Sequence, residues 1–383
     1  MRLIETIAPI FFVLILVELV YCYRNRLSFY RLRDSIADLS LGTLSRIADG
    51  FILIGMVLVY HFLATHLSFS EYLPSFLWRE SSFISWILLF FLIDFLFYWA
   101  HRFSHEINLF WASHVVHHSS EEFNLSVALR QSFVRNLFIG IFYLPLALFG
   151  FSVEAYLITD ALNRTYQFWV HTRTIDRFPS WFEFIFVTPS HHRVHHAMNP
   201  RYIDKNYGGV FIFWDRLFGT FELESEEPVY GVVKPLRTFQ PIWAEVHVFS
   251  DLIRDFRLTK NKWEGFLGFF KPPGYRPSDL EPYPKPKYVS PYSFQKYNPD
   301  SKRNNGYLAY FLVQFVLSAS LSLAFIKTYA QWSVAEIFTF SYVLVFSFYS
   351  LGKGLDHQFD VWRYEIGKWL LLLLLGMYLA VPG

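Results

Sequence analysis

The sequence predicts an all-α, polytopic integral membrane protein with a histidine-rich helical site at its cytosolic face. Hydrophobic residues make up 53% of the 383 residues and charged residues only 17%, which is unlike a soluble globular protein. Several apolar stretches are long enough to cross a bilayer, which takes about 20 residues. Nine of the 14 histidines lie in two short clusters.

The first apolar stretch, residues 4–21, is predicted to be a retained membrane anchor because it lacks a small-residue cleavage site, the alternative being a cleaved signal peptide. Four arginines follow it, and the positive-inside rule places them in the cytosol: Arg24, Arg26, Arg31 and Arg33. Two further spans, at about 50–66 and 83–100, return the chain to the same side. His101 is therefore expected at the cytosolic end of a membrane helix.

The remaining apolar segments complete the predicted topology. Residues 134–169 are interrupted by Pro145 and Gly150, which predicts two helices packed as a hairpin with both ends in the cytosol. Residues 271–299 are rich in proline, tyrosine and lysine, which predicts a surface-lying connection. Three more apolar segments close the chain, at 307–326, 334–351 and 368–381.

These features divide the chain into predicted parts. N-terminal transmembrane helices and a loop occupy residues 1–82, and a catalytic core with the histidine clusters occupies residues 83–245. A cytosolic, proline-rich connection occupies residues 246–305, and C-terminal transmembrane helices occupy residues 306–383.

The two histidine clusters share one spacing. Residues 94–118 carry the first cluster, which consists of His101, His105, His114, His117 and His118. The segment PSHHRVHHAMNP carries the second, which consists of His191, His192, His195 and His196. The pattern H-x-x-H-H occurs in both, and residues three and four positions apart lie on one face of a helix. Each cluster can therefore point its imidazoles at a common centre.

Metal binding explains such clusters better than a structural role does. Burying many imidazoles together costs several kcal/mol unless something ligates them. The single cysteine, Cys22, excludes cysteine-based metal sites. The histidines are too many for one metal, whereas two metals with four or five ligands each fit the count. Imidazole suits iron, zinc and copper alike; paired redox iron that activates dioxygen toward a C–H bond fits a membrane surface best, with a hydrolytic zinc pair as the alternative.

Polar residues near the clusters are further candidates. Glu106 is placed to hydrogen-bond a ligand's N–H or a metal-bound water, the alternative being a solvated helix residue. Asp94 lies within apolar sequence, where acids are usually paired, and Arg102 is its candidate partner. Three polar residues that follow the first triplet are candidates for binding a cofactor or a lipid head group: Asn124, Arg130 and Gln131. The alternative is that they belong to an ordinary interfacial helix.

The spacing resembles the three histidine boxes of the membrane fatty-acid hydroxylase and sterol desaturase superfamily. Its boxes correspond to H-x-x-x-H at His101 and His105, followed by the two H-x-x-H-H triplets. Residues 94–243 resemble most closely the ether-lipid monooxygenases of that superfamily. The stretches that carry this likeness are HRFSHEINLFWASHVVHHSSEEFNLSVALRQS, YQFWVHT, TPSHHRVHHAMNPRYIDKNYGGVFIFWDRLFGTFE and VYGVVKPLRTFQPIW.

The resemblance implies a membrane di-iron monooxygenase that uses dioxygen and takes electrons from tetrahydrobiopterin. Its substrate would be an alkylglycerol or a lyso-alkyl phospholipid, hydroxylated at the ether carbon to a hemiacetal that collapses to a fatty aldehyde and a glycerol derivative. Glu106 would be the essential acidic neighbour, and His191 would adjoin the third box without belonging to it. The implied ligands of the two iron ions are His101, His105, His114, His117, His118, His171, His192, His195 and His196.

Other readings stay open at this point. A relative in the same superfamily would act on a sterol, fatty acid or carotenoid with electrons from a ferredoxin or haem carrier. A non-catalytic protein would be a zinc-binding scaffold or a bis-histidine haem conduit. The net charge of +2 gives no support for nucleic-acid binding. The charge pattern suits an endoplasmic reticulum membrane and a bacterial inner membrane equally, and the oligomeric state is open.

Overall fold

The computed structural model describes residues 2–283, 290, 293–299, 305–357 and 360–380. Within these residues the chain is helical, with two isolated β-bridges. The long helices are α1 (Arg2–Arg24), α2 (Leu32–His66), α3 (Phe83–Glu106), α8 (Val153–Trp169), α12 (Pro241–Leu258), α14 (Asn305–Thr328), α15 (Val334–Leu355) and α16 (Val361–Ala380). The short α-helices are α4 (Asn108–Ala112), α5 (Val115–His118), α6 (Arg135–Ile139), α7 (Leu144–Leu148), α9 (Ser180–Ile185), α10 (Pro189–His195), α11 (Phe213–Phe218) and α13 (Lys262–Leu267). The 3₁₀ turns are η1 (Ser70–Tyr72), η2 (Ser75–Leu77), η3 (Val127–Leu129), η4 (Gly140–Tyr143), η5 (Gly268–Phe270) and η6 (Tyr329–Gln331).

The predicted all-α membrane class is confirmed. Among the described residues, four helical segments are long and apolar enough to cross a bilayer: Leu32–His66, Phe83–Glu106, Gly306–Gln331 and Val334–Leu355. α1 covers the predicted first span and exposes apolar side chains such as Phe12, but it is not among these four. α3 continues beyond the predicted end at residue 100, so that His101 and His105 lie in its last turns.

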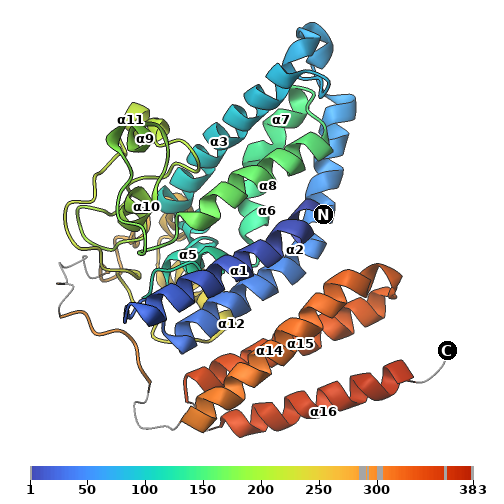
Figure 1. Ribbon diagram of the computed structural model, residues 1–383, viewed down its shortest axis with the longest axis vertical. Coiled ribbons are helices and arrows are strands. Elements are labelled where there is room, and N and C mark those ends of the chain that lie inside the picture. Colours follow the sequence, from blue (N-terminus) through green and yellow to red (C-terminus); the bar gives the residue numbers. More distant parts are fainter. Residues whose placement is uncertain (1, 284–289, 291–292, 300–304, 358–359, 381–383) are drawn as a thin grey trace.

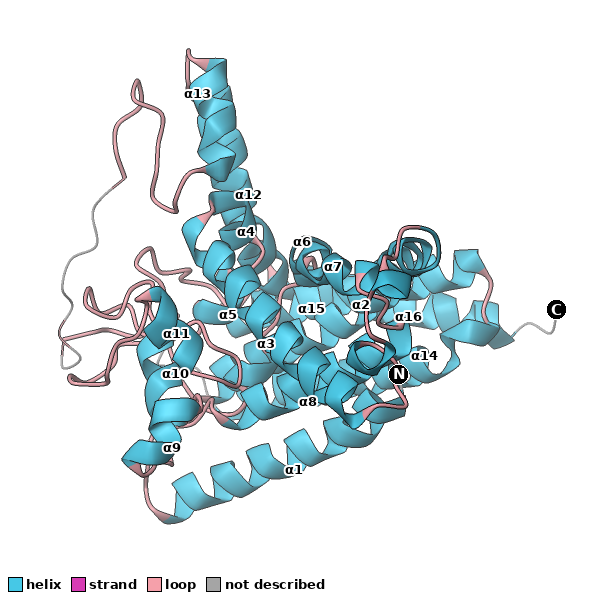
Figure 2. Ribbon diagram, turned by 90° about the horizontal axis from the view of Figure 1, so that it is seen from above, coloured by secondary structure: helices cyan, strands magenta, loops and turns pink. Residues whose placement is uncertain are grey.

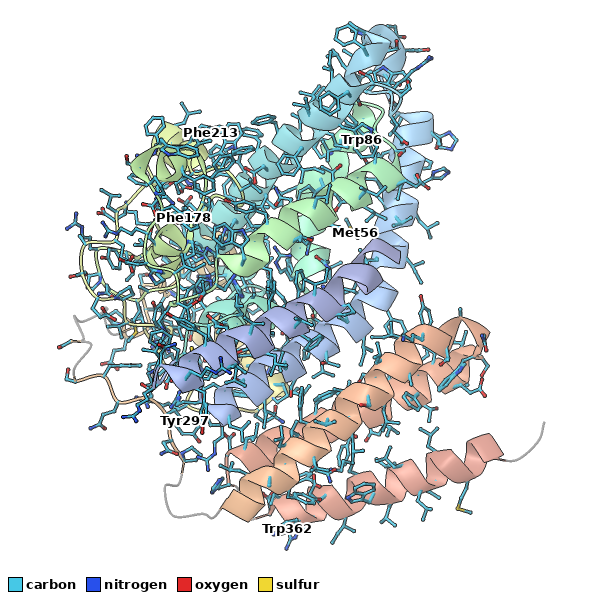
Figure 3. The ribbon with its side chains drawn as sticks, in the orientation of Figure 1. Met56, Trp86, Phe178, Phe213, Tyr297 and Trp362 are labelled. Atoms are coloured by element: carbon cyan, nitrogen blue, oxygen red, sulfur yellow. The ribbon has the colours of Figure 1, made fainter. Side chains whose placement is uncertain are left out.

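Helix α2 holds the layers together. α6, α7 and α8 pack on one side of it, with α3 packed against α8, whereas α14 and α15 pack on another side, with α16 beyond them (Figures 1 and 2). In Figure 3, Met56 marks α2 and Trp362 marks the C-terminal layer. Ile36 and Leu44 of α2 bury their side chains with Phe311, Leu344 and Phe348 of that layer. The histidine clusters lie on the other side of α2.

The region after residue 240 contains further helices. α12 runs across residues 245 and 246, and α13 and η5 follow after the non-helical residues 259–261. This segment supports the site, because Asn108 at the start of α4 donates its amide N–H to the Lys271 carbonyl (2.9 Å) and its Nδ2 to the Gly268 carbonyl (2.9 Å). Residues 284–289, 291–292 and 300–304 of the predicted connection lie outside the described residues. The division of the chain into parts stays a prediction.

Asp94 is the buried anchor between α3, α8 and the segment before α11. Its Oδ1 accepts from Asn163 Nδ2 (2.8 Å) and the Val210 amide (2.8 Å), and its Oδ2 accepts from the Phe211 amide (3.1 Å) and Trp214 Nε1 (3.0 Å). The predicted pairing of Asp94 with Arg102 is therefore wrong. Neutral donors from a distant part of the chain satisfy this carboxylate, which local sequence could not reveal.

The segment 206–211 can approach α3 closely because of one glycine. A Cβ at Gly209 would lie 2.8 Å from Asp94 Oδ1, so only glycine fits without a shift. Asp215 fixes the same segment by accepting the amide N–H groups of Tyr207 (2.7 Å) and Gly208 (2.8 Å). Together these contacts hold the Tyr207 carbonyl beside the end of α3, where the first histidines lie.

Candidate metal centre

The nine predicted ligand histidines come together in two buried groups. In each group, one ring nitrogen per histidine lies within 4.8 Å of the others. The five-histidine group consists of His101, His105, His114, His118 and His195. The four-histidine group consists of His117, His171, His192 and His196. The structure therefore brings together residues that are up to 95 positions apart, from His101 to His196.

The H-x-x-H-H spacing distributes each triplet between both groups. Successive residues on a helix diverge by about 100°, whereas residues four apart share a face. The rings of His117 and His118 are accordingly inclined by 82° and enter different groups. His195 and His196 diverge in the same way, by 84°. The two groups adjoin, since the rings of His118 and His196 stack with centroids 4.3 Å apart.

Backbone carbonyl groups orient several of the imidazoles. A carbonyl oxygen can only accept, so the Nδ1 atom facing it carries the hydrogen and Nε2 keeps its lone pair for a metal. This arrangement occurs at four histidines, whose Nδ1 atoms lie 2.8–3.0 Å from a carbonyl oxygen: His101 (Tyr207), His117 (Arg130), His171 (Gln167) and His195 (Lys205).

The Nε2 atoms converge within each group. They lie 3.1 Å apart in His101 and His114, and 2.9 Å apart in His171 and His192. Neighbouring ligands about 2.1 Å from a metal ion are about 3 Å apart when they meet at right angles. The Nε2 atoms of His105 and His195 are buried with no hydrogen-bond partner. A buried acceptor of this kind is costly unless it is ligated. The two histidine groups therefore fit two metal ions, one in each group.

Burial also sets the protonation state of the site. Desolvation lowers the pKa of His171 to about 3 and that of His195 to about 4, although a backbone hydrogen bond opposes the shift in each case. Desolvation, followed by the neighbouring imidazoles, lowers the pKa of His114 well below its usual value. The imidazoles are therefore neutral at physiological pH, which is the form that binds metals.

Glu106 lies outside both groups. Its carboxylate accepts a hydrogen bond from Arg102 Nε at 2.8 Å, and 37% of its side chain is exposed. The carboxylate beside the five-histidine group is that of Asp204, whose Oδ1 lies 3.8 Å from His105 Nδ1. Asp204 has no helical spacing from the boxes, so no local pattern pointed to it. The catalytic role of Glu106 stays a prediction.

Of the predicted cofactor-binding residues, Gln131 lines the central cavity. Asn124 donates to the Phe29 carbonyl at 2.8 Å and accepts from Ser126. The guanidinium of Arg130 is engaged by three groups of the protein, namely the Val116 carbonyl (2.6 Å), Ser119 Oγ (2.8 Å) and Asp38 Oδ1 (3.1 Å). Cofactor binding by these residues stays a prediction.

His191 belongs to neither group of ligands. Its Nδ1 accepts from the amide N–H of Thr188 at 3.3 Å, which caps the start of α10. It therefore supports the helix that carries His192, His195 and His196.

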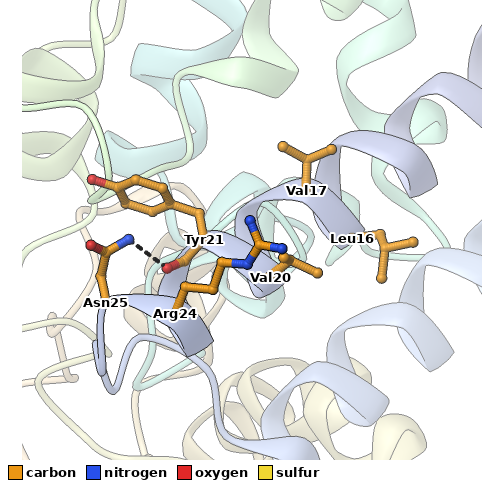
Figure 4. A pocket seen from close by; sticks show the side chains of 6 residues that line it. All are labelled: Leu16, Val17, Val20, Tyr21, Arg24 and Asn25. Atoms are coloured by element: carbon orange, nitrogen blue, oxygen red, sulfur yellow. Dashed lines mark hydrogen bonds between the residues drawn. The ribbon is translucent and has the colours of Figure 1, made fainter.

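A cavity of about 250 Å³ connects the membrane helices with both histidine groups. Five histidines contribute to its lining: His101, His114, His117, His171 and His192. Apolar side chains from α1, α2, α3 and α8 form a large part of the remaining wall, among them Phe11, Leu39, Phe97, Ala161 and Phe168. Polar and charged side chains also line it, including those of Arg46, Arg135 and Arg164. A second hollow, on the last turns of α1, is lined by Leu16, Val17, Val20, Tyr21, Arg24 and Asn25 (Figure 4). Because the second hollow contains no histidine, the first cavity is the one that serves the site.

Comparisons with known proteins agree with this geometry. The fatty acid hydroxylase family model matches residues 86–220. The alkylglycerol monooxygenase of Xenopus tropicalis is 32% identical over 380 residues, which cover 98% of this chain and 82% of that protein. The Danio rerio enzyme of the same name is 33% identical, with 98% and 83% covered.

The human alkylglycerol monooxygenase is 40% identical over 275 residues, which cover 72% of this chain but only 60% of the human protein. No solved structure matches the chain. The extent of the frog and zebrafish alignments includes all three histidine boxes and the helices on either side of them. The chain belongs to the alkylglycerol monooxygenase family, within the fatty acid hydroxylase superfamily.

Proposed function

We propose that the protein is a membrane monooxygenase that hydroxylates the ether carbon of alkylglycerol lipids with dioxygen and tetrahydrobiopterin. The observation that carries this proposal is the cavity, whose lining combines apolar side chains of the long helices with histidines of both groups. The names of the relatives support the reaction type and the class of lipid. The proposal places the histidine groups at the cytosolic face, in the endoplasmic reticulum of a eukaryote or the inner membrane of a bacterium.

The nine histidines would hold two iron ions, which supply the activation of dioxygen when bound. The backbone carbonyls behind His101, His117, His171 and His195 keep the Nε2 lone pairs directed inward. The apolar cavity wall would bind the alkyl chain and exclude water, which holds the ether carbon near the histidines.

The proposed reaction balances as a mixed-function oxidation. One oxygen atom of dioxygen enters the C–H bond beside the ether oxygen, and the other leaves as water. Two electrons and two protons come from the tetrahydropterin, which becomes a dihydropterin. The hemiacetal so formed breaks its bond between carbon and the ether oxygen, and it releases a fatty aldehyde and a free glycerol hydroxyl.

The direct test is fatty-aldehyde release from a 1-O-alkylglycerol by the purified, iron-loaded protein in detergent, with and without tetrahydrobiopterin. We expect aldehyde only when both pterin and dioxygen are present. Release with a ferredoxin or haem carrier in place of the pterin would favour a different electron donor. Absence of aldehyde from an iron-loaded protein with any donor would contradict the proposal and direct attention to sterols and fatty acids.

A further inference from the structure

One arginine in the central cavity lacks a counter-ion. Arg135, the first residue of α6, is half-buried and lines the cavity together with His101 and His114. Its side chain makes no hydrogen bond and no ion pair with any residue that the structure describes. This sets Arg135 apart, because buried charges in proteins are normally paired.

The other arginines of the same cavity are paired. Arg46 contacts Asp49 at 2.8 Å, and Arg164 contacts Asp160 at 2.7 Å. Asn136, the neighbour of Arg135, also donates a hydrogen bond to Asp49. Both nearby carboxylates are therefore occupied, and the cavity keeps one uncompensated positive charge.

This charge persists at neutral pH. Burial, and then the repulsion of the neighbouring Arg164, lowers the pKa of Arg135 to about 10. Arg135 shares the lining of this cavity with His101 and His114 of the five-histidine group.

The position of Arg135 indicates which kind of anion it would meet. The cavity joins Arg135 and the histidines to an apolar wall that includes Phe11, Leu39 and Phe168. A ligand that fits both parts has a long alkyl chain and an anionic group near the ether carbon. In a glycerol ether lipid, that anionic group is a phosphate on the glycerol. A guanidinium offers paired N–H donors that match phosphate oxygens.

We propose that Arg135 binds the phosphate of an anionic ether lipid, so that the cavity selects 1-O-alkylglycerol phosphates over neutral alkylglycerols. This inference rests on the proposed function for the identity of the lipid. With the phosphate at Arg135 and the alkyl chain against Phe11 and Leu39, the ether carbon between them would face the histidines.

The test is equilibrium binding of two radiolabelled ligands to the metal-free, full-length protein in a neutral detergent. The ligands are 1-O-hexadecylglycerol 3-phosphate and 1-O-hexadecylglycerol. We expect the phosphate to bind about 10- to 100-fold more tightly, as a charge-assisted hydrogen-bonded pair predicts. Arg135→Gln should remove this difference by weakening the binding of the phosphorylated lipid more than that of the neutral lipid, whereas Arg135→Lys should keep part of the difference.

Arg24→Gln is the matched control, because Arg24 lies in the outer hollow of α1 and not in the cavity (Figure 4). It removes the same charge from the chain and should leave the discrimination intact. Equal affinity of the wild-type protein for both ligands would overturn the inference, as would an equal loss for both ligands in a folded Arg135→Gln or Arg135→Lys variant. Displacement of the phosphorylated lipid by millimolar inorganic phosphate would show a free-anion site and would also overturn it.

Because binding is measured without metal, its outcome is separate from that of the aldehyde assay. Discrimination at Arg135 without turnover would leave the anion site standing and contradict the proposed function. Turnover of neutral alkylglycerol, with equal affinity for the two ligands, would support the proposed function and contradict the anion site at Arg135.

Discussion

Two successive histidines at the end of α10 enter different histidine groups. His195 lies in the five-histidine group, His196 lies in the four-histidine group, and His191 caps the same helix. His195→Ala and His196→Ala should each lower the bound iron to about half, because each removes a ligand from one group only. His191→Ala, the matched control, should retain both ions. Iron per chain is measured by mass spectrometry on the purified variants, and equal iron loss in all three would contradict the assignment.

The protonation state of the histidines predicts how the metal-free protein responds to acid. An unfolded imidazole titrates near pH 6.5, whereas burial lowers the pKa of His195 to about 4 in the folded chain. Between these values the unfolded chain binds a proton that the folded chain does not bind. The contribution of His195 to the free energy of unfolding is therefore complete above pH 6.5. It is lost as the pH drops toward 4, which lowers the free energy of unfolding by about 3 kcal/mol for His195 alone.

His171, whose pKa is lowered to about 3, extends this loss to lower pH. Thermal unfolding of the metal-free protein in detergent, followed from pH 7 to pH 4, measures the effect. A melting temperature that stays constant over this interval would show that the imidazoles are not buried in the neutral form.

Among the elements, α3 depends on the segment that precedes α11. Asp94 accepts hydrogen bonds from two amide groups of that segment, those of Val210 and Phe211. Asp94→Asn would place an NH₂ group against N–H donors, which costs about 1–3 kcal/mol for each donor left unpaired. We expect a lower melting temperature and weaker iron retention, because the same segment holds His101 through the Tyr207 carbonyl.

Glu154→Gln is the control for Asp94→Asn, since Glu154 is exposed on α8 and the change likewise converts a carboxylate to an amide. It should leave the melting temperature and the iron content unchanged. Wild-type stability of Asp94→Asn, measured by the same thermal unfolding, would show that Asp94 is not the anchor between these elements.

The spacing of neighbouring residues predicted the histidine boxes, but it could not predict features that depend on partners distant in sequence. The histidine boxes follow from helical periodicity, which is written into neighbouring positions. The predicted span began at about residue 50, whereas α2 begins at Leu32. The acidic residues of its first half interrupt the apolar pattern, and their partners are distant in sequence, as in the pair of Asp38 with Arg130 at 3.1 Å. The partners of Asp94 are equally remote, with Val210 lying 116 positions away. A hydropathy pattern cannot identify either of these pairings.

For the whole molecule, the C-terminal layer is a separate unit that packs on α2 away from the histidines (Figure 1). A buried polar network holds it together, in which Lys368 donates to Gln314 Oε1 (2.8 Å) and Glu365 Oε2 (2.6 Å). The predicted apolar segments located these helices. Hydropathy alone could not show that they contact α2 and contribute no residue to the described lining of the cavity.

We propose that nine histidines from distant parts of the chain form one centre for two adjacent iron ions. Iron analysis combined with Mössbauer spectroscopy of the iron-loaded, full-length protein is the decisive measurement. We predict about two irons per chain and the spectrum of a spin-coupled pair, since the two groups adjoin at His118 and His196. One iron per chain, or two irons with the spectra of isolated ions, would contradict the account.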